Sequence, residues 1–294
     1  MLIKSMASTI PSYAMSSFLL PVSVTSSLDR IFKKFWWGFP KDRSRNLSLK
    51  SWSSICLPKH ERGLGFKRMH DFNLALIAKL GWKLLSNSKC LWVKQFQSKY
   101  IKYGDFLSSP IHSTASWLWK GIQQIKLLIY AGACINVSRT SSSSIWTSNW
   151  VPSIPNFKLG PKFPLNKNLS SLQIRDLIDP IQNIWKASSI HALFDSFSTQ
   201  EILKLQISTD PESTYIWTHS SSGNFSTSSA YTSLTAYASN ATSSFFFSHF
   251  WKSIWKLNLY DWLRLFLWKI AWNILPTKER LGQLFPISDT FCPV

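Results

Sequence analysis

The chain has 294 residues, of which 45% are apolar and 16% charged, and 33 Lys and Arg against 14 Asp and Glu give a net charge of +19 at pH 7. This length and apolar content allow about two folded domains and exclude a disordered chain. No apolar run reaches the roughly 18 residues of a membrane span, and four scattered cysteines without a secretory signal argue against a disulfide framework. We therefore expect an intracellular protein, nuclear or cytoplasmic, with no membrane partner.

The positive charge is concentrated in the first third of the chain. Residues 1–104 contain 18 Lys and Arg against 4 Asp and Glu, a net charge of +14, whereas residues 105–294 have a net charge of +5. Such an asymmetry favours a polyanionic partner, because each neutralised phosphate releases condensed counterions. The alternative is a solvated basic surface that has no polyanionic partner.

The first well-defined element is an amphipathic helix near residues 28–36. Residues 1–16 precede it and are predicted to be helical with a break at Pro11. Ser26 or Ser27 is the expected N-cap, and Gly38 with Pro40 is the expected end. Apolar residues recur at helical spacing: Leu28, Ile31, Phe32, Phe35 and Trp36. The opposite face has Asp29, Arg30, Lys33 and Lys34, and a basic loop follows directly.

This helix and loop are the predicted phosphate-contacting surface. Cations gather there beside a tryptophan that can stack on a base. The predicted nucleic-acid-binding residues are Arg30, Lys33, Lys34, Trp37, Lys41, Arg43, Arg45 and Lys50. The expected partner is the backbone of RNA or DNA.

The next elements lead to a first predicted hairpin. Residues 47–68 are expected to be irregular and partly extended, with a glycine turn around Leu64. Helices are predicted for 71–86, 90–100 and 116–130, and two strands, 133–137 and 144–150, around a Ser-rich turn. Residues 1–150 are thus predicted to form a basic helical domain with a hairpin near 133–150.

Four prolines between residues 151 and 169 mark the predicted domain boundary, so 151–170 is expected to be a linker. Beyond it we predict a helix at 199–205, a hairpin of 214–218 with 223–226, a helix at 228–238, and three helices near 246–257, 261–273 and 277–284. The predicted fold class is α+β, predominantly helical, with two short β-hairpins and two subdomains.

The sequence contains no recognisable catalytic motif. A polymerase holds two metal ions with neighbouring carboxylates, but no Asp-Asp pair occurs, and Tyr103-Gly104-Asp105 lacks the second Asp of a Tyr-x-Asp-Asp signature. The 14 acids are scattered, whereas a ribonuclease H site needs four together. Cys56, His60 and His70 do not have zinc-knuckle spacing. Composition leaves a Ser/His/Asp arrangement open, but we expect no enzyme.

Several short motifs occur in a defined order along the chain. They are Phe35-Trp36-Trp37-Gly38, Trp52 to Lys59, Gly63 to Phe66, Phe72-Asn73, Ile145-Trp146-Thr147, Asn149-Trp150, Ser222 to Ser226, and Trp251 to Trp255. In this order they resemble plant LINE-type (non-LTR) retrotransposon polyproteins, in the region after the reverse transcriptase core that runs into the reverse-transcriptase zinc-binding domain. Arg62 stands where the family usually has Gly, and Ser148 where it usually has Asp.

The resemblance implies a thumb- or connector-like domain in residues 1–150 and a truncated zinc-binding-like domain in residues 171–294. Cys292 would be one ligand of an incomplete metal site. A structural zinc ion needs four ligands, so we expect no cofactor in this chain, and zinc only if downstream ligands were present.

The predicted function is that of a non-catalytic, nucleic-acid-binding remnant of a reverse transcriptase. The alternative is a protein-interaction or structural module that packs on neighbouring polyprotein domains, or a decayed fragment without function. An exposed, ordered apolar patch distinguishes the interaction module from the nucleic-acid binder.

Overall fold

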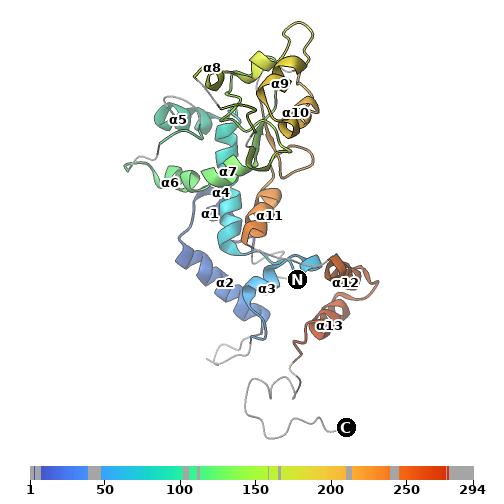
Figure 1. Cartoon of the computed structure of the whole chain (residues 1–294). Helices are drawn as coiled ribbons and strands as arrows, with labels where there is room; N and C mark the ends of the chain where they lie inside the picture. The colour runs from blue at the N-terminus through green and yellow to red at the C-terminus, as the bar shows by residue number, and fades with distance from the viewer. Residues whose placement is uncertain are drawn as a thin grey trace. The chain divides into compact units, whose positions relative to one another are not determined.

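The computed structural model describes residues 3, 8–38, 48–101, 106–110, 113–157, 159–164, 167–209, 214–238, 245–275 and 277. Two compact units divide the chain: unit 1 is Met1–Met15, Leu20–Asn73 and Ala238–Val294, and unit 2 is Ser16–Leu19 and Leu74–Tyr237. Helices predominate, and the described residues form a single two-stranded sheet (Figure 1). The predicted α+β, mostly helical class is therefore confirmed.

Unit 1 consists of short helices around an aromatic core. Its elements are α2 (Val22–Trp36), α3 (Trp52–Cys56), the 3₁₀ turn η2 (Lys59–Glu61), α12 (Phe245–Lys256) and α13 (Asp261–Ala271), while α1 (Ser12–Ser17) and α4 (Met69–Leu85) each continue into unit 2. The Phe66 ring is nearly buried and stacks on Trp52, with ring centroids 5.5 Å apart. Trp36 of α2 meets the same ring edge-on at 5.1 Å. Phe66 thus joins α2 to α3.

The segment 47–68, predicted to be irregular, instead contains two short helices and a tight turn. The Ser51 hydroxyl accepts a hydrogen bond from the Ser54 amide at 3.2 Å and caps α3. A Cβ on Gly63 would lie 1.8 Å from the carbonyl oxygen of Leu57, and Gly65 has a φ of +65°. Both glycines are required by the backbone path, so the turn was predicted correctly but the helices around it were not.

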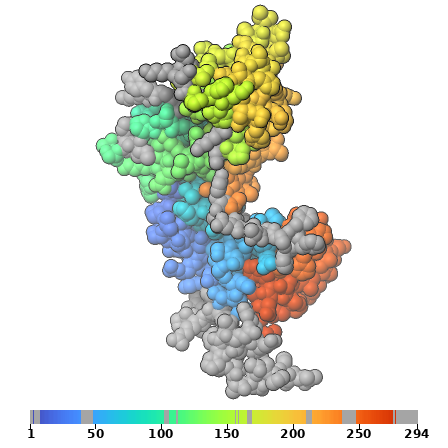
Figure 2. Space-filling model, in the orientation of Figure 1, coloured from blue at the N-terminus to red at the C-terminus, as the bar shows by residue number. Residues whose placement is uncertain are grey.

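The C-terminal helices α12 and α13 pack within unit 1. In the space-filling view, the orange and red segment lies against the blue segment that contains η2 (Figure 2). The Trp268 Nε1 donates to the carbonyl oxygen of Arg62 at 2.7 Å, across 206 residues of sequence. Trp268 is fully buried and stacks on Trp272. The turn after η2 is therefore fixed by a distant helix.

Unit 2 is built on α4 and a series of shorter elements. These are α5 (Leu91–Tyr100), α6 (Trp117–Gln124), α7 (Lys126–Gly132), β1 (Ala133–Ile135), η3 (Pro155–Phe157), α8 (Lys167–Ser170), η4 (Ile174–Leu177), α9 (Ala187–Leu193), α10 (Ser196–Leu203), β2 (Tyr215–Trp217) and α11 (Thr227–Ala238). One core cluster surrounds Trp119, a second surrounds Trp150, and a third surrounds Trp217. Each cluster thus has one buried tryptophan, and isoleucine is the most frequent buried residue of the first two.

The two predicted β-hairpins are wrong. Strand β1 pairs with β2, antiparallel, with Ala133 opposite Trp217 and Ile135 opposite Tyr215. Residues 144–150 form mainly turns instead of a strand, and the Asn149 side-chain amide donates to the carbonyl oxygen of Tyr130 at 2.7 Å. The sheet therefore consists of one strand from the first predicted hairpin and one strand from the second. Their pairing closes a long loop.

The predicted linker lies inside unit 2. Val151, Ile154 and Leu159 are buried in the cluster around Trp150. The prolines prevent regular structure, but the apolar residues between them still bury their side chains. The division of the chain by compactness therefore differs from the segments 1–150, 151–170 and 171–294 expected from composition.

Candidate nucleic-acid interface

A half-buried carboxylate helps to set the orientation of α2. Asp29 Oδ1 accepts a hydrogen bond from Trp52 Nε1 at 3.0 Å and another from the Met69 amide at 3.1 Å, at the start of α4. Phe32, three residues later, is buried. These two side chains hold one face of α2 against the core. The other face, with Arg30 and Lys34, is directed outward and exposed.

Asp29 has an unusual environment for a carboxylate. Burial raises its pKa above the ordinary value of 3.8, and the hydrogen bonds from Met69 and Trp52 oppose that rise. Desolvation is the larger effect, so the folded chain favours the protonated form relative to a solvated aspartate. The sequence placed this residue on the polar face of the helix, and the structure shows that it is a core contact.

The structure locates five of the eight predicted nucleic-acid-binding residues. Arg30 and Lys34 are exposed on α2, and Lys33 and Trp37 are half-buried at its end. Lys50 lies elsewhere in unit 1, where its Nζ is 4.8 Å from the centroid of the Trp272 ring. The remaining three, Lys41, Arg43 and Arg45, lie outside the described residues, as does Cys292.

Carboxylates do not neutralise the cations of unit 1. Over its whole sequence this unit has 18 Lys and Arg against 7 Asp and Glu. Of the described acids, Asp29 accepts two hydrogen bonds, Asp71 pairs with Arg68, Asp261 pairs with Arg264, and Glu61 Oε1 lies 3.4 Å from His60 Nε2. The described cations that form no ion pair with a described acid are Arg30, Lys33, Lys34, Lys50, Lys59, Lys67, Lys252, Lys256 and Lys269.

A second basic group of unit 1 was not predicted. Lys59 Nζ lies 4.3 Å from the Trp255 ring centroid, and α12 packs on η2, so Lys59 joins the exposed Lys252 and Lys256 of α12. In the sequence, 183 residues lie between Glu61 at the end of η2 and Phe245 at the start of α12. In the sequence, the signal for this group was that Lys252 and Lys256 are four residues apart, which places them on one helix face.

Part of the apolar stripe predicted to bury α2 is exposed. Phe32 is buried, but Ile31 and Phe35 are 58% and 59% exposed. Helix α13 has a comparable exposed apolar face, since Trp262 and Phe266, one turn apart, are 66% and 46% exposed. Unit 1 thus presents ordered apolar side chains as well as cations.

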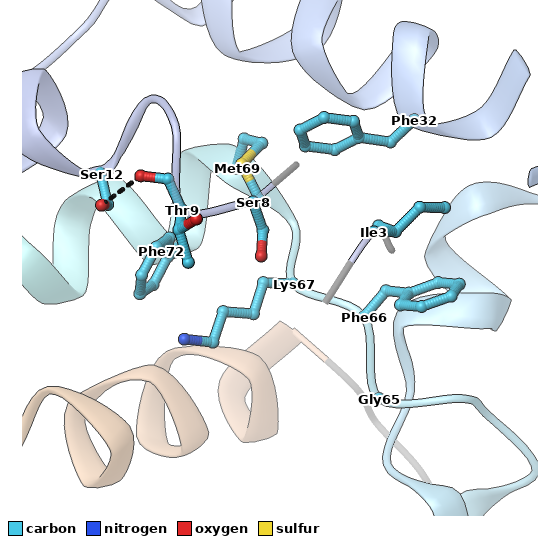
Figure 3. A pocket seen from close by; sticks show the side chains of 10 residues that line it. All are labelled: Ile3, Ser8, Thr9, Ser12, Phe32, Gly65, Phe66, Lys67, Met69 and Phe72. Carbon is cyan, nitrogen blue, oxygen red and sulfur yellow. Dashed lines mark hydrogen bonds between the residues drawn. The ribbon is translucent and has the colours of Figure 1, made fainter. Parts of the chain in front are cut away.

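A cavity of about 290 Å³ lies in unit 1 beside the Gly-Leu-Gly turn (Figure 3). Hydroxyl groups and one ammonium group line part of it: Ser8, Thr9, Ser12 and Lys67. The remaining walls are Ile3, Phe32, Gly65, Phe66, Met69 and Phe72. The cavity therefore combines a cation with an aromatic lining.

Among the described residues, no three His, Cys, Asp or Glu side chains lie close enough together to hold a metal ion. Burial raises the pKa of the Cys56 thiol, and burial raises that of Cys134 to about 12. Both thiols are therefore protonated near neutral pH and are weak nucleophiles. No described helix is long and apolar enough to cross a membrane.

The motifs that carry the family resemblance have structural roles. The Asn73 side chain accepts from the Leu20 amide and donates to the Met15 carbonyl, both at 2.7 Å. In unit 2, the Trp150 Nε1 donates to the Ile145 carbonyl oxygen at 2.9 Å. These motif residues bind backbone groups of the same chain, so their presence indicates how the chain folds.

Comparison with known proteins finds two similar plant proteins. One, from Arabidopsis thaliana, is named "Putative ribonuclease H protein"; it is 27% identical over 299 residues, which cover all of this chain and 47% of that protein. The other, also from Arabidopsis thaliana, is named "Uncharacterized mitochondrial protein"; it is 25% identical over 143 residues, 48% of this chain and 92% of that protein. The chain spans about half the length of the first relative. Neither a protein-family model nor a solved structure matches the chain.

Proposed function

We propose that unit 1 binds the phosphate backbone of RNA or DNA without catalysis, as a remnant of a LINE-type reverse transcriptase. The observation that carries this proposal is the set of described cations without a carboxylate partner, gathered in a unit whose described acids each contact a residue outside this set. The ordered family motifs and the likeness to a plant protein named for ribonuclease H support a retroelement origin. Binding would take place in the nucleus or the cytoplasm.

Backbone binding explains this arrangement better than base reading does. Arg30 and Lys34 lie one helical turn apart and are both exposed, a spacing that suits neighbouring phosphates on one strand. Lysines dominate the unpaired set, and an ammonium group acts as a point charge without the planar fork that reads guanine. We therefore expect little sequence specificity.

The test is the salt dependence of binding to a random-sequence duplex, measured by fluorescence anisotropy. For B-DNA the slope of log K against log salt changes by about 0.9 for each phosphate neutralised. Replacing Arg30 and Lys34 together by Gln should make the slope shallower by about 1.8 and weaken binding equally for unrelated sequences.

The matched control removes two exposed lysines of unit 2, Lys89 and Lys94, by the same substitution. It lowers the net charge of the chain equally, so a loss of general attraction affects both variants. Equal slopes for the two variants would show that α2 is not the contact surface. No binding by the unmodified chain at about 50 mM salt would refute the proposed function itself.

A second candidate function is docking of a protein partner. The exposed apolar side chains of α2 and α13, Ile31, Phe35, Trp262 and Phe266, favour it, because ordered patches of this kind mark interaction surfaces. Hydroxyl-radical labelling of these side chains, with the chain alone and joined to the polypeptide encoded in frame beside it, tests this function. Protection of α13 only in the longer protein would support docking, and equal labelling would contradict it.

A further inference from the structure

The cavity in unit 1 has an unpaired cation on one side. Lys67 forms no ion pair with a described carboxylate, and burial lowers its pKa. Its Nζ lies 3.8 Å from the centroid of the Phe72 ring. Ser8, Thr9 and Ser12 line the same cavity, where the Ser12 hydroxyl donates to the Thr9 carbonyl oxygen (Figure 3). An ammonium group without a carboxylate partner is a suitable contact for a phosphate or carboxylate.

The side of the cavity away from the Lys67 ammonium is aromatic and held in place (Figure 3). Phe32 and Phe66 are each less than a tenth exposed, while Phe72 lies on the Lys67 side. Phe66 is packed between Trp36 and Trp52, and Phe32 lies on α2, which Asp29 pins to the core. These rings therefore have little freedom to collapse into the cavity. At about 290 Å³ it is at the small end of ligand pockets, which start at roughly 300 Å³.

We propose that this cavity binds a single nucleotide, with the phosphate at Lys67 and the base against the phenylalanine rings. A nucleotide combines an anion with one flat, apolar body, which matches the two sides of the cavity. Bases stack on aromatic side chains irrespective of sequence. A fatty acid would place a long flexible chain in a cavity of about 290 Å³, and an isolated phosphate would leave the rings without a partner. The nucleotide is the end of a bound strand or a free monophosphate.

This inference rests on the proposed function in one respect, that the polyanion of unit 1 is a nucleic acid. It adds a particular site, separate in sequence from Arg30 and Lys34. The site does not depend on them for charge, because Lys67 follows the Gly-Leu-Gly turn and belongs to neither α2 nor α12. Binding of a strand along α2 and binding of one nucleotide in the cavity can therefore be measured separately.

The experiment titrates the full chain with UMP and AMP, and isothermal titration calorimetry measures the binding. Uridine, inorganic phosphate and benzoate are titrated under the same conditions. We expect both nucleotides to bind, and uridine, which lacks the phosphate, to bind about 10- to 100-fold more weakly. Phosphate and benzoate should also bind more weakly, since each lacks one of the two parts.

The decisive variant is Lys67→Met, which keeps a long apolar side chain and removes the charge. It should weaken nucleotide binding by about 10- to 100-fold. The matched control is Lys59→Met, because Lys59 also lies over an aromatic ring but does not line the cavity. Near-ultraviolet circular dichroism of both variants checks that the aromatic core is unchanged.

The results separate the site from the proposed function. If duplex binding keeps its salt slope but UMP and AMP do not bind, the nucleotide site is refuted and backbone binding stands. If Lys67→Met and Lys59→Met weaken UMP binding equally, the ligand is not in this cavity. Benzoate binding as tightly as UMP would refute the nucleotide as the ligand class. A terminal 5′-phosphate on a short strand that competes with UMP, while a 5′-hydroxyl strand does not, would identify a strand end as the source.

Discussion

Asp29 allows the clearest quantitative test of the structure. Its carboxylate satisfies two partly buried donors, Trp52 Nε1 and the Met69 amide. A buried donor left without a partner costs about 1 to 3 kcal/mol. Asp29→Ala should therefore lower the free energy of unfolding by about 2 to 4 kcal/mol. Asp29→Asn keeps the accepting oxygen, so the expected loss is below about 1 kcal/mol at acidic pH.

The pH dependence of the Asn variant has a defined sign. Burial raises the folded-state pKa of Asp29 above its ordinary value of 3.8. The native state therefore retains its proton to higher pH than the unfolded state does. The stabilising contribution of protonated Asp29 is complete below pH 3.8 and is lost as pH rises through the raised pKa. Asn does not titrate, so Asp29→Asn should become more stable relative to the unmodified chain as pH increases through that window.

Urea unfolding followed by tryptophan fluorescence, between about pH 3.5 and 7, measures this difference. Asp261→Asn is the control, because the side chain of Asp261 is 76% exposed. Stability curves of the Asp29→Asn variant and the unmodified chain that stay parallel over the range would show that burial does not control this carboxylate. A small loss for Asp29→Ala would show that it does not pin α2.

Three further predictions concern the turn, catalysis and zinc. Gly63→Ala should lower the free energy of unfolding in urea by more than about 3 kcal/mol, because its Cβ would lie 1.8 Å from the Leu57 carbonyl oxygen. At Gly38 a Cβ would meet no atom within 4 Å, so Gly38→Ala should lower it by only about 1 to 2 kcal/mol, for the positive φ. Similar losses for the two variants would contradict the turn geometry. The purified chain should neither extend a primer nor cleave RNA in a hybrid with Mg²⁺ or Mn²⁺, and activity abolished by replacing one Asp would overturn this. Elemental analysis should find less than one zinc per chain, and one tightly held zinc would show that Cys292 has partners that its sequence spacing does not reveal.

Helices with a clear apolar period were predicted closely. The predicted helices 71–86, 90–100 and 261–273 correspond to α4, α5 and α13 within one or two residues at each end. Their patterns are local, so neighbouring residues suffice to reveal them. The predicted helix 116–130 is instead two helices, α6 and α7, separated at Ile125. Both stretches share one apolar composition, which conceals the break.

Strand pairing was not predictable in the same way. The sequence pairs each predicted strand that contains a tryptophan with a strand close to it along the chain. In the structure, β1 and β2 instead pair across about 80 residues. Gly132 makes room for this pairing. A Cβ there would lie 2.3 Å from the Trp217 ring, so the glycine lets the ring approach the backbone. A lone glycine at a helix end carries no information about which distant residue it admits. The buried side of α2 was hidden for a similar reason, since the partners of Asp29 are 23 and 40 residues away.

The motif residues have contacts inside the fold, whereas the surface cations do not, and this difference limits what the family resemblance can support. Trp52, Gly63, Phe66 and Asn73 are held by packing or hydrogen bonds inside unit 1, so a change at any of them disturbs the fold. The exposed cations of α2 have no such internal partner, and replacing them leaves the core untouched. Resemblance in the motifs is therefore evidence for a shared fold, and it supplies no measure of whether the charged surface still binds a nucleic acid. Only variants of the surface cations, whose stability should match that of the unmodified chain, can answer the functional question without a contribution from misfolding.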